Sequence, residues 1–583
     1  MFSASTLSRI TLLLASAVPA LLAAELPGRY FALLDAGARK VDDRLRSEPS
    51  ADLAQLETTA GWKHFGYSIL APAVLYTRQH AANPRYHDPA LLALTIRIGD
   101  LLASEHEKGK FKPRLDSDWD TYTWLEAYRL IGRELDATRR ERWKRALLEN
   151  VASLENDAAE RLDFPWYQSP YIGTSPNHYS QWAQLLYLAG QMFDNPKWKD
   201  LGGRILHRFA AVEQSADGFW GEHTRDGPTI GYNHLTLSAV AVYYEHSKDP
   251  AALQALRRSL TFHENFTYPD GIPVETMNDR NRYWGVSAWS QFAFSHFPDG
   301  RRYAEFLSKF FGPASLTMDQ IGRLAQDALY YHEGPLAPIP QDGDRYVRQM
   351  SIPAGIRKTG PWTVSLSGLI ETQAITNQFY LDRQANISVF HSRAGLIISG
   401  ANSKRQPELA TFREKLTTGE VLHLPASSRL QMTPTGDRVS LAFNSFFADL
   451  FVAPPSDSEI KLRFAISGKG RPPEEAFATL QLVLHPGETL QTAHRTITVS
   501  AEPVKLGPEE IGGWIQHHGW KLYVDPGARL TWPSYPFNPY QNAPEQTLDH
   551  AVAALSVPLQ LRSRPGRYVR PNEQEIAFRL TAE

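Results

Sequence analysis

Cysteine is absent from the 583 residues of this chain. The absence excludes disulfide bonds, thiolate metal sites, cysteine nucleophiles and lipid attachment through a thiol. An excess of charge is absent too, because 61 Lys and Arg residues against 63 Asp and Glu residues give a formal net charge of −2. A nearly neutral chain has no electrostatic footprint for nucleic acid, so we expect no nucleic-acid partner. Local cations must therefore bind any polyanionic substrate.

Several familiar catalytic motifs are missing as well. The sequence has no P-loop, no Gly-rich dinucleotide turn, no HExxH motif and no GxSxG nucleophile elbow. Histidine spacing offers little support for a metal, since His223 and His234 lie eleven positions apart and the pair His517 and His518 lies far from both. We therefore expect no required cofactor. A structural divalent metal stays open, although the sequence gives it no support.

A long apolar run occurs at the start of the chain and nowhere later. Arg9 precedes the apolar residues 10–22, and small residues follow up to Ala24. This pattern is typical of a cleaved secretory signal peptide over residues 1–24. A membrane anchor is the alternative, but the run is shorter than the ~20 residues that a span requires. We expect a bacterial periplasmic or secreted protein, with no membrane association after cleavage.

The rest of the chain has two hydrophobic periods. From residue 25 to 333, apolar residues recur at spacings of three and four, as in 180–193 and 235–244, which predicts helices joined by short links. Residues 334–345 are rich in Pro and polar residues and are the expected linker. Residues 346–583 alternate, as in 362–367, which predicts antiparallel strands. The fold class expected is α+β multidomain, with a helical domain before a β domain.

The first candidate site precedes a predicted helix at residues 171–182. Asn177 has an amide that can hydrogen-bond a carboxylate, and His178 has a side chain suited to proton transfer near neutral pH. The alternative is structural: an Asn that caps the helix beside a histidine that packs.

The second candidate site, residues 217–234, crowds acids, an arginine, a tyrosine and histidines together. Arg225 can hold a carboxylate with two hydrogen bonds, and Glu222 can assist in binding. Tyr232 precedes an apolar helix, and a phenol can act as acid or base when nearby cations lower its pKa. The alternative is a loop in which Glu222 and Arg225 pair while Tyr232 packs.

The third candidate site lies at residues 268–285. It offers cations for anionic groups, rings for stacking on sugars and a carboxylate for orientation, at Arg280, Arg282, Tyr283, Trp284 and Glu275. An ion-paired hairpin between helices explains the same residues equally well. Trp119 and Trp124 are further candidate sugar platforms beside acids that suit a helix start.

The helical half, the Asn177–His178 pair, the later Tyr232 and the following β half together resemble the heparinase II/III-like and alginate-lyase-type polysaccharide lyases. The resemblance implies an N-terminal incomplete (α/α) toroid followed by a C-terminal antiparallel β-sandwich. It also implies β-elimination on a uronic-acid polysaccharide, with Asn177 and His178 near the substrate carboxylate and Tyr232 in proton transfer. His391 is the matching candidate from the β domain. The partner implied is an anionic polysaccharide or oligosaccharide.

Two other functions stay open on the residues alone. An inverting glycoside hydrolase needs two carboxyl groups about 6.5–9.5 Å apart. The acids that could supply them are Asp118, Asp120, Glu222, Asp270 and Glu275. A carbohydrate-binding protein without catalysis is the other alternative, consistent with an aromatic content of 11%.

Overall fold

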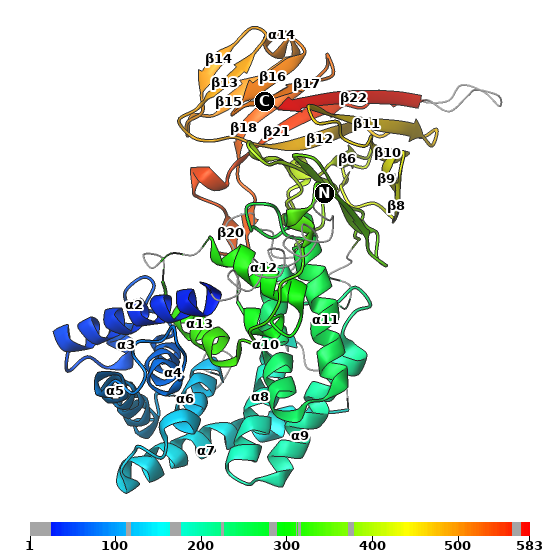
Figure 1. Cartoon of the computed structure of the whole chain (residues 1–583). Helices are drawn as coiled ribbons and strands as arrows, with labels where there is room; N and C mark the ends of the chain where they lie inside the picture. The colour runs from blue at the N-terminus through cyan, green and yellow to red at the C-terminus, as the bar shows by residue number, and fades with distance from the viewer. Residues whose placement is uncertain are drawn as a thin grey trace, which may run out of the picture. The chain divides into compact units, whose positions relative to one another are not determined.

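The computed structural model describes two compact units (Figure 1). The first comprises the chain up to residue 225 with residues 231–262 and 287–339, and the second comprises 226–230, 263–286 and 340–583. The boundary near Ile339 lies within the linker expected at 334–345. The described residues are 25–111, 118–163, 176–222, 225, 227–278, 289–310, 312, 316–370, 378–379, 381–561 and 573–582. The predicted signal peptide lies outside them.

Helices make up the N-terminal half. They are α2 (Glu25–Ser47), α3 (Leu53–Leu56), α4 (Leu70–Thr77), α5 (Pro89–Glu107), α6 (Asp118–Ile131), α7 (Ala137–Glu160), α8 (Pro176–Met192), α9 (Pro196–Arg208), α10 (Ile230–Ser247), α11 (Pro250–Asn265), α12 (Pro298–Ser308) and α13 (Met318–Tyr330). Short polar side chains set several starts: Asp136 accepts from the Arg139 amide at 2.9 Å, and Asn195 accepts from the Trp198 amide at 3.2 Å.

Contacts between alternate helices define two layers. In one layer α5 contacts α7 and α7 contacts α9, and in the other α4 contacts α6 and α6 contacts α8. Helix α8 is buried on nearly every side, whereas α9 buries one face. Helix α13 contacts both α2 and α4. Two rows of paired helices are the arrangement of an α/α toroid, so the expected helical architecture is confirmed.

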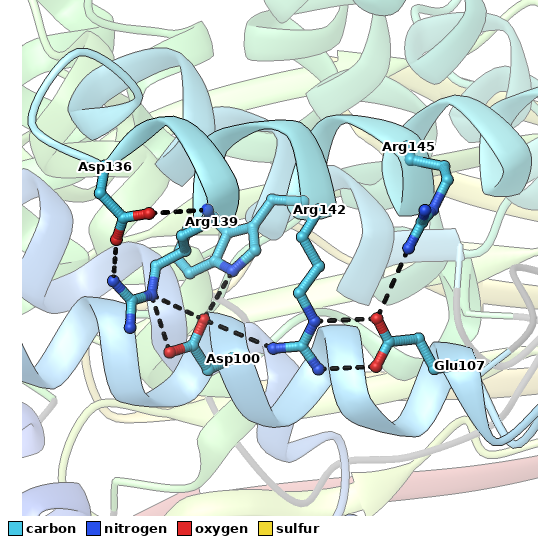
Figure 2. A network of polar contacts seen from close by, with 7 residues as sticks. Asp100, Glu107, Asp136, Arg139, Arg142 and Arg145 are labelled. Atoms are coloured by element: carbon cyan, nitrogen blue, oxygen red, sulfur yellow. Dashed lines mark hydrogen bonds and ion pairs between the residues drawn. The ribbon is translucent and has the colours of Figure 1, made fainter.

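Ion pairs join α5 to α7 (Figure 2). Arg139 contacts Asp100 at 2.9 Å, and Arg142 contacts Glu107 at 2.7 Å. The indole Nε1 of Trp143 also donates to Asp100, at 2.9 Å. The Arg142 guanidinium lowers the pKa of Glu107. These partly exposed pairs orient the two helices, while the buried faces supply most of the stability.

Antiparallel sheets make up the C-terminal half. One sheet contains β1 (Arg345–Gln349), β2 (Ala354–Thr359), β3 (Trp362–Ser367), β4 (Ile387–His391), β5 (Gly395–Ser399), β6 (Phe412–Lys415), β7 (Val421–Leu422), β12 (Glu475–Val483), β15 (Val504–Leu506), β18 (Arg529–Ser534) and β21 (Val552–Pro558). A second contains β8 (Ser427–Thr433), β9 (Gly436–Ala442), β10 (Phe446–Val452), β11 (Glu459–Gly468), β13 (Thr489–Thr492), β14 (Thr496–Thr498), β16 (Trp514–His517), β17 (Trp520–Tyr523) and β22 (Glu573–Ala582). The short strands β19 (Phe537–Asn538) and β20 (Ala543–Pro544) pair separately, and α14 spans Pro508–Ile511.

The two large sheets share one apolar core, which makes the unit a sandwich. Trp362 on β3 and Phe412 on β6 belong to the same buried cluster as Phe464 on β11 and Phe578 on β22. The ring centroids of Phe412 and Phe464 lie 5.2 Å apart. Inward residues alternate with outward ones along β11, as the period of two requires. The predicted β-sandwich is therefore confirmed. Among the described helices, none combines the length and apolarity needed to cross a membrane.

Candidate active site

The Asn177–His178 pair lies in the first turn of α8. Pro176 begins this helix. Proline suits the first helical position, because an N–H there would have no acceptor within the helix. Asn177 follows it inside the helix and is buried, with 3% of its surface exposed, while His178 is partly exposed. The Ser180 hydroxyl donates to the Asn177 carbonyl at 3.0 Å. Asn177 therefore occupies the helix itself and is not the residue that precedes it as a cap.

Tyr179 is adjacent to this pair but faces the helical core. Its hydroxyl donates to the Ala158 carbonyl at 3.3 Å. Burial raises the pKa of the Tyr179 phenol to about 12. A phenol with this pKa stays protonated near neutral pH, so Tyr179 is unsuited to the role of general base.

A hydrogen-bond chain attaches the second candidate segment to α10 and α11. The Trp220 amide donates to Asn233 Oδ1 at 2.9 Å, and Asn233 Nδ2 donates to Ser259 Oγ at 3.2 Å. Ser259 Oγ in turn donates to the Gly218 carbonyl at 2.7 Å. Gly218 has φ +95°, and a Cβ there would lie 2.1 Å from the Arg258 carbonyl oxygen. Only glycine permits this close approach. Together with the hydrogen bonds, it fixes the position of the backbone that leads to Glu222.

Tyr232 lies in the first turn of α10 and is partly exposed. The next residue, Asn233, is buried and accepts the hydrogen bond from the Trp220 amide. Glu222 has only 2% of its surface exposed, and Arg225 is exposed. His223 lies outside the described residues. Asn177, His178 and Tyr232 thus share one property: each is in the first turn of a helix of the same unit.

The helical unit also contains a buried polar network, which sequence reasoning missed. Glu126 on α6 accepts from Tyr330 on α13, and Gln326 donates to the Tyr122 hydroxyl at 2.8 Å. Ser238 on α10 donates to Gln326 at 2.9 Å. The network joins α6, α10 and α13 and fixes the helix that carries Tyr232. No local motif signals it, because its members come from three separate helices.

The two candidate tryptophan platforms are core residues. Trp124 has no exposed surface, and its ring centroid lies 6.0 Å from that of Trp143. Trp119 has 1% exposed, and its ring packs 4.8 Å from Tyr67 and 4.4 Å from the Arg323 guanidinium. A sugar platform needs an open ring face. The expectation that these rings stack on sugar is therefore not met.

Glu275 is buried inside the second unit, in the 3₁₀ turn η4 (Glu275–Met277). Its Oε1 accepts from Ser388 Oγ at 2.7 Å and from the Gly400 amide at 2.9 Å, and its Oε2 accepts from the Tyr268 hydroxyl at 3.0 Å. Burial raises the pKa of this carboxyl. Both oxygens of the Glu275 carboxylate accept hydrogen bonds from residues of the same unit. Glu275 therefore has structural contacts in place of the expected contact with substrate.

His391 ends β4 and is buried, with 1% of its surface exposed. Its ring lies 4.5 Å from that of Trp362, and its Nδ1 accepts weakly from the Ala394 amide at 3.4 Å. Burial lowers the pKa of this imidazole. The side chain packs inside the sandwich unit, because a strand residue on the inner face is covered by the sheet opposite. The expected binding role of His391 is therefore not met in this conformation.

Four further predicted residues lie outside the described part of the chain. They belong to the third candidate segment and are Arg280, Arg282, Tyr283 and Trp284. Their proposed contacts with anionic groups and sugar rings stay predictions.

Comparison with known proteins finds one family model and several solved structures that resemble parts of this chain. Residues 101–294 match the model of the ulvan lyase N-terminal domain. The fold resembles that of chondroitin AC lyase from Streptomyces coelicolor A3, with a TM-score of 0.52, 13% identity and coverage of 96% of this chain and 82% of that one. The family match is confined to residues 101–294, and the likeness to the solved structure is one of fold.

A second solved structure in the comparison is a heparan sulfate lyase mutant from Pedobacter heparinus. It has a TM-score of 0.46 and 12% identity, and the alignment covers 89% of this chain and 76% of that one. No curated protein sequence matches this chain. The matched range 101–294 contains Asn177, His178 and Tyr232.

Proposed function

We propose that this chain is a polysaccharide lyase that cleaves a uronic-acid-containing polysaccharide by β-elimination, and that Asn177, His178 and Tyr232 carry the reaction. The observation that supports the proposal most directly is the match of residues 101–294 to an ulvan lyase domain, because this range contains all three residues. The placement of each residue in the first turn of a helix is consistent with it. Rigid helix starts hold side chains more precisely than loops do.

The chemistry begins at the substrate carboxylate. The hydrogen on C5 of a uronate is a weak acid, and its removal places negative charge on the adjacent carboxyl group. The Asn177 amide donates to that group, and the exposed Arg225 supplies a positive charge toward it. Stabilising charge as it develops lowers the barrier to proton removal. The buried position of Asn177 strengthens this effect, because less water competes for its hydrogen bonds.

Proton transfers complete the elimination. Either His178 or Tyr232 takes the C5 proton. The electron pair of the broken C–H bond forms a double bond between C4 and C5, and the bond from C4 to the glycosidic oxygen breaks. Tyr232 protonates the departing oxygen. The products are an unsaturated uronate end and a free hydroxyl, and every step uses groups of this chain alone.

An activity screen tests this function. The purified protein is incubated with ulvan, chondroitin sulfate, heparan sulfate and alginate, and the ultraviolet absorbance of unsaturated uronate is followed. We expect the absorbance to rise with one of these polymers and not with a neutral polysaccharide. Cleavage that produces only saturated reducing ends would contradict elimination and favour a hydrolase.

We also propose that the protein is exported to the periplasm or the medium. The proposal depends on the basic, apolar and small residues within 1–24. N-terminal sequencing of protein recovered from these fractions tests it. A mature chain that begins close after Ala20 or Ala24 supports export, and an intact first residue in the cytoplasmic fraction contradicts it.

A further inference from the structure

One carboxylate and two imidazoles meet in the helical unit, at a place that the proposed reaction does not use. Glu245 lies in the last turn of α10, His296 lies two residues before the start of α12, and His332 lies two residues after the end of α13. Oε1 of Glu245 lies 3.0 Å from Nε2 of His296 and 2.8 Å from Nε2 of His332. The three ligand atoms all lie within 4.8 Å of one another. Three elements that are distant in sequence thus direct donor atoms at one point.

We propose that Glu245, His296 and His332 bind a zinc ion. Two imidazoles and a carboxylate are a characteristic zinc ligand set, whereas calcium and magnesium select oxygen donors. Zinc bonds of about 2.0–2.2 Å place tetrahedral ligand atoms about 3.3 Å apart. The two oxygen–nitrogen distances of 2.8 and 3.0 Å are close to this value. Only small side-chain movements are needed to accommodate the ion.

The surroundings orient the three ligands. Lys248 donates to Oε2 of Glu245 at 3.0 Å, so Oε1 remains directed at the imidazoles. The His332 amide donates to Ser295 Oγ at 3.0 Å, which anchors the two histidine segments to each other. The Tyr244 ring lies edge-on to His296, with centroids 4.9 Å apart. Fixed outer contacts of this kind are what metal ligands require.

His296 provides the observation that favours a metal over a simple ion pair. Its Nε2 is buried and lies 3.0 Å from Glu245 Oε1, but among the described residues it makes no well-directed hydrogen bond. A buried nitrogen whose one close contact is poorly directed calls for a better-placed partner, and a zinc ion between it and Glu245 would be that partner. His332 has 43% of its side chain exposed, which leaves a path for the ion and a position for a water ligand.

The site is remote from the proposed reaction. Glu245 and Tyr232 lie at opposite ends of α10, about 20 Å apart at the rise of an α-helix. An ion bound by Glu245 would connect the end of α10 to the segments that precede α12 and follow α13. Its expected effect is therefore on the stability of the helical unit, since a ligand that binds only the folded state stabilises it.

Zinc binding to the full chain tests the proposal. Protein treated with a chelator and dialysed is titrated with zinc chloride by calorimetry, and its Tm is measured with and without zinc. We expect one ion per chain and a higher Tm with zinc. His332→Gln and Glu245→Gln should weaken binding by more than the about 10–100-fold that loss of an outer-shell partner costs.

The matched control is His207→Gln. His207 contacts Asp249 at 2.7 Å as an exposed histidine–carboxylate pair and belongs to no three-ligand group among the described residues. This variant should bind zinc like the wild type. His332 is the most exposed ligand, so its substitution disturbs packing least. The His332→Gln variant therefore provides the test if substitution of His296 prevents folding. A wild-type chain that takes up no zinc, or a His332→Gln variant with unchanged affinity, would overturn the proposal.

Discussion

Asn233 holds Trp220: its Oδ1 accepts the Trp220 backbone N–H at 2.9 Å, across thirteen positions of sequence. Both residues are buried, with 1% of their surface exposed. The bond fastens the segment that leads to Glu222 against the helix turn that carries Tyr232. Two groups of the candidate site are thus positioned by one amide that need not touch substrate.

Asn233→Ala should destabilise the fold and lower activity together. The substitution leaves the buried Trp220 N–H without its acceptor, which costs about 1–3 kcal/mol. Urea unfolding measures the loss, and initial rates measure the activity of the fraction that remains folded. Thr261→Ala, on the partly exposed face of α11, should change stability by less than about 0.5 kcal/mol. Equal stability of the two variants would contradict the role given to Asn233.

Tyr232→Phe should remove turnover without loss of stability. The substitution deletes only the hydroxyl, and loss of a general acid or base costs about 10²–10⁴-fold in rate. Initial rates on the active polysaccharide and the Tm report the two effects separately. Tyr179→Phe is the matched control, because its phenol donates to the Ala158 carbonyl inside the core. Full activity in Tyr232→Phe would remove this residue from the mechanism.

Asn177→Ala should reduce kcat by about 10²–10³-fold, the loss expected when one donor to a developing anion is removed. KM should change less, because the charge that Asn177 stabilises grows in the transition state. Ser180→Ala serves as the control, since it removes the hydrogen bond to the Asn177 carbonyl and leaves the Asn177 amide intact. A rise in KM with unchanged kcat would show that Asn177 only binds the ground state.

Asp327 makes stability depend on pH. The carboxyl is buried and accepts from the Phe292 amide at 2.8 Å, and burial raises its pKa to about 8. A carboxyl whose pKa is higher in the folded state binds a proton on folding. Its contribution to stability is complete below the unfolded pKa of about 3.9 and is lost as the pH rises through the folded value.

Asp327→Asn should therefore become more stable relative to the wild type as the pH rises. The amide keeps an acceptor for the Phe292 N–H and cannot ionise. Within the window between the two pKa values, the difference should grow by about 1.4 kcal/mol per pH unit. Urea unfolding of both proteins at about pH 5 and about pH 8 measures it. A difference that is the same at both pH values would contradict the protonation of Asp327.

Local pattern was sufficient for the order of the elements. The apolar spacing at 235–244 predicts a helix, and the structure has α10 there; the alternation at 362–367 predicts a strand, and β3 occupies these residues. Period-two and period-3.6 patterns are properties of neighbouring residues. Pattern could not show that residues 226–230 and 263–286 group with the second unit, because that grouping depends on packing between distant segments.

The candidate site was predictable only in part. The type of residue marked Asn177, His178 and Tyr232, but the same reasoning selected Trp124 and His391, whose rings pack against other aromatic rings inside their units. An aromatic ring has the same sequence signature whether it fills a core or lines a cleft. The group formed by Glu245, His296 and His332 left no spacing to recognise, since its members lie on three elements.

The sequence by itself determined the helical and β halves, the absence of thiol chemistry and the residue types available for acid–base work. Only the tertiary structure decided which polar groups are buried, which are held by other side chains and which converge on one point. The physical reason is that secondary structure follows from the periodicity of adjacent residues. Burial and convergence depend instead on contacts between segments that are far apart in the chain.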